Sequence, residues 1–156
     1  MRIGLFSDAY LPDINGVVSS IATLKAALEK LGHTVFVVSN HNGINVKYDA
    51  ENHILRLPGL EVKKFYGYKM SNPIQLRGEE YIRKMDLDVI HVHTEMGIGL
   101  FARQMAKKYN IPLVYTYHTL YEDYLHYVNP KDFQTVDQAG RRVVRYLSKL
   151  AGNGPM

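Results

Sequence analysis

The chain has 156 residues, of which 46% are hydrophobic and 22% charged, with a formal net charge of +4 and no cysteine. This composition excludes a disordered protein, and the lack of cysteine excludes disulfide bonds and thiolate sites. The net charge is small for a nucleic-acid-binding protein, so we expect no nucleic-acid partner. The first residues lead directly into an apolar segment and no apolar run approaches about 18 residues, which predicts no signal peptide, no membrane span and a cytoplasmic location.

Apolar runs and helical patterns alternate along the chain. The nearly continuous apolar runs at 2–7 and 34–39 are typical of strands buried on both faces of a parallel sheet. Between them, apolar residues recur at helical spacing from Val17 to Leu31, and Gly32 is a natural helix stop. The same reasoning predicts strands at 53–58, 88–93 and 112–117, and helices at 72–85, 97–110 and 135–152.

This alternation predicts an α/β fold with a doubly wound parallel sheet of the Rossmann-like type. We expect the spatial strand order third, second, first, fourth, fifth. In such sheets ligands bind at the carboxyl ends of the strands where the strand order reverses, here between the first and fourth strands. The loops at 7–15, at 93–97 and from 117 onward therefore lie at the predicted ligand site.

The pair Asn15-Gly16 stands at the start of the first predicted helix. Helix N-termini present N–H groups that suit phosphate or carboxylate, and Gly16 has no side chain to block a close approach. The alternative is a turn followed by an ordinary helix cap from Asn15. No G-x-G-x-x-G motif and no P-loop lysine pattern occurs, which argues against a dinucleotide dehydrogenase or a Walker-type NTPase.

Three histidines and one glutamate are further candidates near the predicted site. His118 follows the fifth strand directly and can hydrogen-bond a ligand, or can simply be bonded into the end of the sheet. His91 and His93 share one face of the fourth strand, but no further ligand has metal-site spacing, so we expect no metal. Glu95 can orient a sugar hydroxyl or cap the next helix.

The segment "KKFYGYK" combines basic and aromatic side chains. Basic residues attract anionic headgroups and aromatic rings favour the water–lipid interface, which predicts contact with an anionic membrane surface. The alternative is a solvated loop with a few packed rings. The candidate membrane residues are Lys63, Lys64, Phe65, Tyr66 and Lys69.

Two long blocks of the chain resemble glycosyltransferase family 4, whose enzymes have the GT-B fold. The first is "MRIGLFSDAYLPDINGVVSSIATLKAALEKLGHTV", and the second is "DVIHVHTEMGIGLFARQMAKKYNIPLVYTYHTLYEDY". Within that family the segment "LPGLEVKKFYGYKMSNP" resembles bacterial 1,2-diacylglycerol 3-glucosyltransferases in particular.

The resemblance implies an enzyme of two Rossmann-like domains, of which this chain is the amino-terminal, acceptor-binding one. It implies retaining transfer of glucose from a nucleotide sugar, UDP-glucose, to the 3-hydroxyl of diacylglycerol at the inner face of the cell membrane, with no required metal or cofactor. It also implies roles for individual residues. These are donor binding by Asn15, Gly16 and Val17, catalysis by His118, and acceptor binding by Asp13, Glu95, Thr119 and Tyr121.

We expect residues 1–156 to form one domain that is incomplete at its carboxyl end, because a further strand would normally follow the last helix. The nucleotide-sugar-binding domain is absent from the chain, so the chain alone is expected to be inactive. Two alternatives stay open. One is a family 4 enzyme with another acceptor, such as phosphatidylinositol or a soluble sugar, and the other is a non-catalytic engineered binding fragment.

Overall fold

The computed structural model describes residues 1–61, 69–71, 76–95 and 97–118. The chain divides into two compact units, Met1–Thr116 and Tyr117–Met156. The fold described below is that of the first unit, because only Tyr117 and His118 of the second are among the described residues. The helix predicted at 135–152 lies outside the described residues.

Strands and helices alternate through the first unit, as predicted. In chain order the elements are β1 (Arg2–Phe6), α1 (Gly16–Lys30), β2 (Thr34–Asn42), β3 (Lys47–Asp49), β4 (Ile54–Glu61), β5 (Lys69–Ser71), α2 (Leu76–Met85), β6 (Val89–Val92), α3 (Gly97–Tyr109) and β7 (Leu113–Tyr115). In the part of the chain that the structure describes, no helix is both long enough and apolar enough to cross a membrane.

The sheet has the order β3-β4-β2-β1-β6-β7, with β5 also paired to β4. The five predicted strands are β4, β2, β1, β6 and β7, and they are parallel neighbours in the predicted order. The prediction missed β3 and β5, which pair antiparallel with β4 and make the sheet mixed. Their sequences, KYD and KMS, are short and lie in no apolar run, whereas the equally short β7 lies within the apolar run at 112–117.

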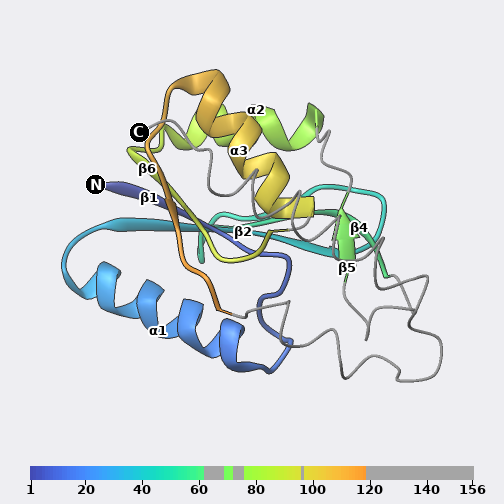
Figure 1. Ribbon diagram of the computed structural model, residues 1–156, viewed down its shortest axis with the longest axis horizontal. Helices are drawn as coiled ribbons and strands as arrows, with labels where there is room; N and C mark the ends of the chain where they lie inside the picture. The colour runs from blue at the N-terminus through green and yellow to red at the C-terminus, as the bar shows by residue number, and fades with distance from the viewer. Residues whose placement is uncertain (62–68, 72–75, 96, 119–156) are drawn as a thin grey trace, which may run out of the picture. The chain divides into compact units, whose positions relative to one another are not determined.

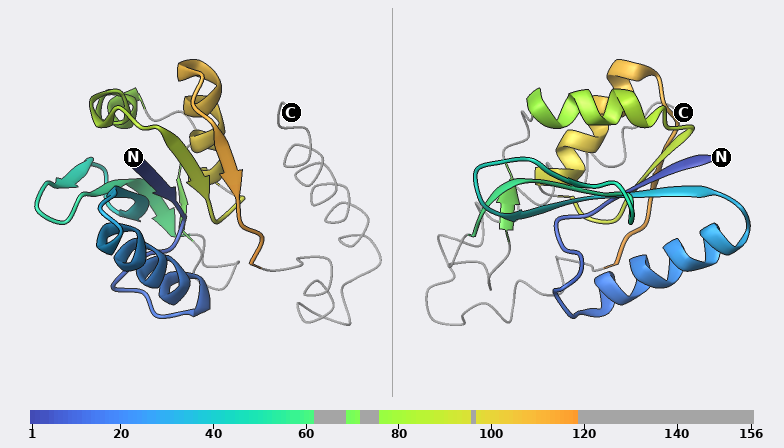
Figure 2. Two further views of the ribbon diagram at one scale, coloured as in Figure 1. Left: turned by 90° about the vertical axis from the view of Figure 1, so that its left-hand side faces the viewer. Right: turned by 180° about the vertical axis from the view of Figure 1, so that it is seen from behind.

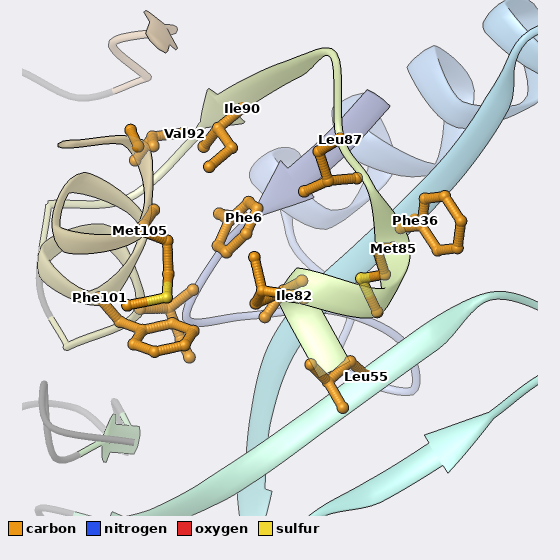
Figure 3. Packing of buried hydrophobic residues seen from close by; sticks show 14 of the residues in the cluster. Phe6, Phe36, Leu55, Ile82, Met85, Leu87, Ile90, Val92, Phe101 and Met105 are labelled. Carbon is orange, nitrogen blue, oxygen red and sulfur yellow. The ribbon is translucent and has the colours of Figure 1, made fainter. Parts of the chain in front are cut away.

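Helices cover both faces of the sheet, so the fold is the doubly wound α/β type that the sequence predicts. Figures 1 and 2 show α1 on one face, with α2 and α3 together on the other. Figure 3 shows the larger core, where Ile82 and Met85 of α2 and Phe101 and Met105 of α3 pack over Phe6 of β1. A smaller core under α1 joins its Ile21 to apolar residues of β1 and β2.

Local signals define the ends of α1. Asn15 has extended backbone angles, and its side-chain Oδ1 accepts a hydrogen bond from the N–H of Val18 at 2.9 Å. The helix ends before Gly32, whose φ of +83° lies in the left-handed region that glycine adopts without strain. The predicted N-cap and stop are therefore confirmed, and the cap places the start of α1 at the carboxyl edge of the sheet.

Candidate functional site

The strand order reverses between β1 and β6, where the sequence predicts the ligand site. Phe6 of β1 lies opposite Val92 of β6, and the N–H of His93 donates to the carbonyl oxygen of Phe6 at 2.8 Å. The loops that follow β1 and β6 therefore leave the sheet side by side. This is the place where doubly wound sheets bind ligands.

The loop after β1 is long, but it is tied to the fold at several points. Tyr10 is buried in the core under α1, and its carbonyl oxygen accepts a hydrogen bond from the N–H of Asp13 at 3.2 Å. The guanidinium of Arg56 on β4 donates to the carbonyl oxygen of Leu11. At its end Asn15 caps α1. The loop therefore presents its residues in a defined conformation.

The start of α1 is open, which suits a ligand. A Cβ atom built on Gly16 would meet no other atom within 4 Å, so the fold itself does not require glycine there. The side chain of Val17 is partly buried and packs against the smaller core. The first N–H groups of a helix have no carbonyl partner within the helix and carry partial positive charge. The side chain of Asn15 is occupied by its capping bond.

Asp8 makes hydrogen bonds to three other segments at this edge, and sequence reasoning missed it. Its side-chain Oδ2 accepts from the hydroxyl of Thr94 at 2.7 Å, and its Oδ1 accepts from the N–H of Ile98 at 3.0 Å and from the amide of Asn40 at 3.2 Å. The N–H of Asp8 donates to the Thr94 hydroxyl at 2.8 Å. One residue thus joins the ends of β1, β2 and β6 to the first turn of α3.

Burial dominates the ionisation of Asp8, which is only 4% exposed. Desolvation raises the pKa of its carboxyl group from 3.8 to about 6, although the hydrogen bonds from Thr94, Ile98 and Asn40 act in the opposite direction. The signal that could have identified it is an ionisable side chain two residues after a buried strand, at the edge where the loops after β1 and β6 leave the sheet side by side.

Glu95 stands in a tight turn between β6 and α3. A Cβ atom built on Gly99 would lie only 2.0 Å from the carbonyl oxygen of Thr94, so the turn closes tightly enough to require glycine at this position. The N–H of Ile98 donates to the carboxyl group of Asp8, so the side chain of Glu95 is not the acceptor for this N–H. One carboxyl oxygen of Glu95, Oε1, is buried and has no hydrogen-bond partner among the described residues.

His91 of β6 packs against His93, which lies just after the end of that strand. The rings of His91 and His93 have centroids 4.1 Å apart, and Nε2 of His91 lies 2.7 Å from the hydroxyl of Thr116. Among the described residues no group of three or more His, Asp or Glu side chains could hold a metal ion. His118 follows Thr116 by two positions but belongs to the second compact unit, so its place at the site stays a prediction.

Five of the predicted site residues lie at the carboxyl edge of the sheet. Asp13, Asn15, Gly16 and Val17 lie after β1, and Glu95 lies after the neighbouring β6. Lys69 begins β5. The other predicted residues lie outside the described residues, and they are Thr119, Tyr121, Lys63, Lys64, Phe65 and Tyr66.

The fold is a doubly wound α/β domain with a candidate ligand site at the carboxyl edge of its sheet. Comparison with known proteins adds the family, since residues 14–152 match the family model described as Glycosyltransferase Family 4. The chain belongs to glycosyltransferase family 4. The resemblance read from the sequence is thereby confirmed.

Individual relatives show which enzymes of this family the chain is similar to. The chain is 44% identical over 131 residues to an alpha-monoglucosyldiacylglycerol synthase of Acholeplasma laidlawii, covering 83% of this chain and 32% of that protein. It is 39% identical over 128 residues to the synthase of the same name from Streptococcus pneumoniae, covering 82% of this chain and 29% of that protein. A GDP-mannose-dependent alpha-mannosyltransferase of Mycolicibacterium smegmatis is 24% identical over 131 residues, covering 76% of this chain and 32% of that protein. The chain therefore spans about a third of the length of these relatives.

Proposed function

We propose that this chain is the acceptor-binding part of a retaining glycosyltransferase that moves glucose from UDP-glucose to the 3-hydroxyl of diacylglycerol at the inner surface of the cell membrane. The observation that carries the proposal is the identity of 44% and 39% with two proteins named alpha-monoglucosyldiacylglycerol synthases. The geometry of the carboxyl edge supports it, because the edge offers separate places for a donor and an acceptor.

The donor diphosphate would bind at the start of α1. The N–H groups of Gly16 and Val17 belong to the first turn, where partial positive charge favours an anion. The open space around Gly16 would let the diphosphate approach the backbone directly. Asn15 would contribute by holding the helix start in place through its cap.

The acceptor would lie along the loop after β1 and against Glu95. Asp13 stands on the braced part of that loop, and Glu95 follows the neighbouring strand β6 at the same edge of the sheet. Thr119 and Tyr121 are assigned to the acceptor by family resemblance.

In the reaction the bond between the anomeric carbon of glucose and the diphosphate oxygen breaks. A new bond forms from that carbon to the acceptor oxygen, the acceptor hydroxyl passes its proton to the departing diphosphate oxygen, and UDP leaves. His118 would contribute a hydrogen bond at the reaction centre. No metal or other cofactor is required in this scheme.

A second domain would supply the remaining donor contacts, since the relatives are about three times as long as the matched region. The 156-residue chain alone is therefore expected to transfer no glucose. The segment with Lys63, Lys64, Phe65, Tyr66 and Lys69 would hold the enzyme on anionic lipid as a peripheral protein.

The experiment measures transfer by the full-length protein that carries this chain, in mixed micelles. UDP-glucose and GDP-mannose are compared as donors, and diacylglycerol, phosphatidylinositol and a soluble sugar as acceptors. We expect glucosyl-diacylglycerol as the main product, with the anomeric configuration of the donor retained. A preference for GDP-mannose or for another acceptor would overturn the proposal, and turnover by the 156-residue chain alone would overturn its assignment as only one part of the enzyme.

A further inference from the structure

We propose that Ile14 and Ile44, two exposed side chains at the carboxyl edge of the sheet, insert into the surface of the membrane that holds the lipid acceptor. We call these two side chains the apolar rim. The inference rests on the proposed function for the presence of a membrane. It extends that function from the basic segment around Lys63 to apolar side chains on two other loops.

The apolar rim is marked by its exposure. Ile14 and Ile44 are the two most exposed large apolar side chains among the described residues, at 92% and 87%. Ile14 lies on the loop after β1 and Ile44 on the loop after β2, and these strands are parallel neighbours. Both loops therefore leave the same edge of the sheet, and Figure 1 shows the start of α1 and the end of β2 on the same side of the view. Leu11, on the first loop, is also exposed.

Hydrogen bonds fix the backbone next to both side chains. Asn15, directly after Ile14, caps α1 through the N–H of Val18 at 2.9 Å. In the second loop Nδ1 of His41 lies 3.2 Å from the carbonyl oxygen of Asn42, and Nε2 lies 2.8 Å from that of Asn45.

The imidazole of His41 thus spans the turn that contains Ile44. Because the loops are already ordered, contact with a partner would cost little further conformational entropy. Contact with lipid hydrocarbon would remove the apolar surface of both side chains from water. Single exposed apolar residues are common, but two such residues on braced loops at one edge suit an apolar partner.

The charges at this edge favour an anionic lipid surface as that partner. Lys47 begins β3 directly after the second loop, and Lys69 begins β5, which pairs with the carboxyl end of β4. Residues 41–47 include no acidic side chain, and Asp13, the acidic neighbour of Ile14, is half-buried. Apolar side chains with basic neighbours are the combination by which peripheral proteins bind the water–lipid interface. Insertion of the apolar rim would bring the proposed acceptor site to the surface where diacylglycerol lies.

The first test compares vesicle binding by three variants of the full-length protein, Ile14→Ser, Ile44→Ser and Leu31→Ser. Leu31→Ser is the matched control, because Leu31 is 72% exposed but follows the end of α1 at the opposite edge of the sheet. Co-sedimentation with vesicles of phosphatidylglycerol and phosphatidylcholine is measured with added salt, which screens the basic residues. We expect each isoleucine variant to bind about tenfold more weakly, as for partial burial of one branched aliphatic side chain. Leu31→Ser should bind like the parent.

The second test places a polarity-sensitive fluorophore on Ile14→Cys, Ile44→Cys and Leu31→Cys in turn. The parent protein treated with the same reagent gives the background from the rest of the chain. We expect a blue shift on addition of vesicles at the first two positions and none at the third. Blue-shifted emission at Ile14 and Ile44 before vesicles are added would show that another part of the protein covers the apolar rim, and would overturn the proposal.

Failure of this inference can be distinguished from failure of the proposed function, because vesicle binding requires no glucosyl transfer. If the parent glucosylates diacylglycerol but both isoleucine variants bind vesicles like the parent, the apolar rim is overturned and the proposed function stands. If these variants lose binding but the parent transfers no glucose to diacylglycerol, the apolar rim stands and the proposed function falls. An equal loss of binding in Leu31→Ser would indicate non-specific adsorption and would overturn the apolar rim, as would a parent protein that binds no vesicles.

Discussion

The buried carboxyl group of Asp8 makes the stability of the fold depend on pH. Because its pKa is raised from 3.8 to about 6 by burial, the folded protein binds a proton between these values that the unfolded chain releases. The contribution of Asp8 to stability is therefore complete below about pH 4 and is lost as the pH rises through 6. A shift of about 2 pKa units corresponds to about 3 kcal/mol in the free energy of unfolding.

We predict that Asp8→Asn removes this part of the pH dependence. The amide has the same shape, and its oxygen can still accept from the N–H of Ile98. Urea unfolding of both chains between pH 4 and 7 gives the difference in their free energies of unfolding. That difference should change by about 3 kcal/mol across the range, with the parent favoured at low pH. Parallel curves for the two chains would contradict the raised pKa.

Gly16 allows a second test at the residue scale, because the fold does not need glycine there. Gly16→Ala adds a methyl group that meets no protein atom within 4 Å, so the free energy of unfolding should be unchanged or slightly higher. The same methyl group stands where the donor diphosphate would approach the backbone. We expect the donor KM of the full-length protein to rise about tenfold, with the acceptor KM unchanged. An unchanged donor KM would remove Gly16 from the donor site.

His118 is the predicted catalytic residue, and its test separates catalysis from stability. His118→Ala in the full-length protein should lower kcat by about 10²–10⁴-fold while changing the donor KM much less. His33→Ala is the matched control, because His33 lies just before β2 at the opposite edge of the sheet. Thermal unfolding is recorded on the same samples. If the loss of activity in His118→Ala only matches its unfolded fraction, the residue braces the fold and is not catalytic.

At the scale of one element, α3 is held to the sheet by its first turn. Gly99→Ala would place a methyl group 2.0 Å from the carbonyl oxygen of Thr94, and backbone atoms would have to move. We predict a loss of about 1–3 kcal/mol in the free energy of unfolding, as is typical of overpacked sites. Gly16→Ala in the first turn of α1 is the matched control, and urea unfolding measures both. Equal stability of the two variants would show that the turn can relax.

At the scale of the whole molecule, the predicted membrane contact depends on charge. Replacing Lys63, Lys64 and Lys69 by Ser should remove most binding to anionic vesicles, at about 1 kcal/mol for each lysine near the surface. Binding of the parent should also weaken with added salt, because exposed charges are screened over about 10 Å at 0.1 M ionic strength. Co-sedimentation with vesicles containing phosphatidylglycerol measures both effects.

The control for membrane binding is a variant with the same loss of net charge elsewhere. Lys30, Lys84 and Lys107 lie at the ends of α1, α2 and α3, and all three are replaced by Ser. If this control loses as much binding as the first triple variant, the attraction comes from net charge and not from the segment. If neither variant loses binding, the segment is an ordinary loop.

The strands of the central sheet were predictable because their signals are local. Continuous apolar runs predicted β1 and β2, the spacing of apolar residues with Asn15 and Gly32 predicted α1, and the alternation of elements predicted the strand order. The edge that carries the candidate site followed from that order. The two antiparallel strands β3 and β5 were not predicted, because neither lies in an apolar run of the kind that marked the equally short β7, and their pairing depends on β4.

The sequence by itself therefore determined the doubly wound fold, the edge where ligands would bind, and the family, since all three are encoded in patterns of neighbouring residues. Only the tertiary structure revealed the role of Asp8, whose partners Asn40, Thr94 and Ile98 lie 32, 86 and 90 positions away in the chain. It likewise revealed why Gly99 must be glycine while Gly16 need not be. Such contacts depend on which strand ends lie together in space, and this arrangement cannot be predicted from a local pattern of residue types.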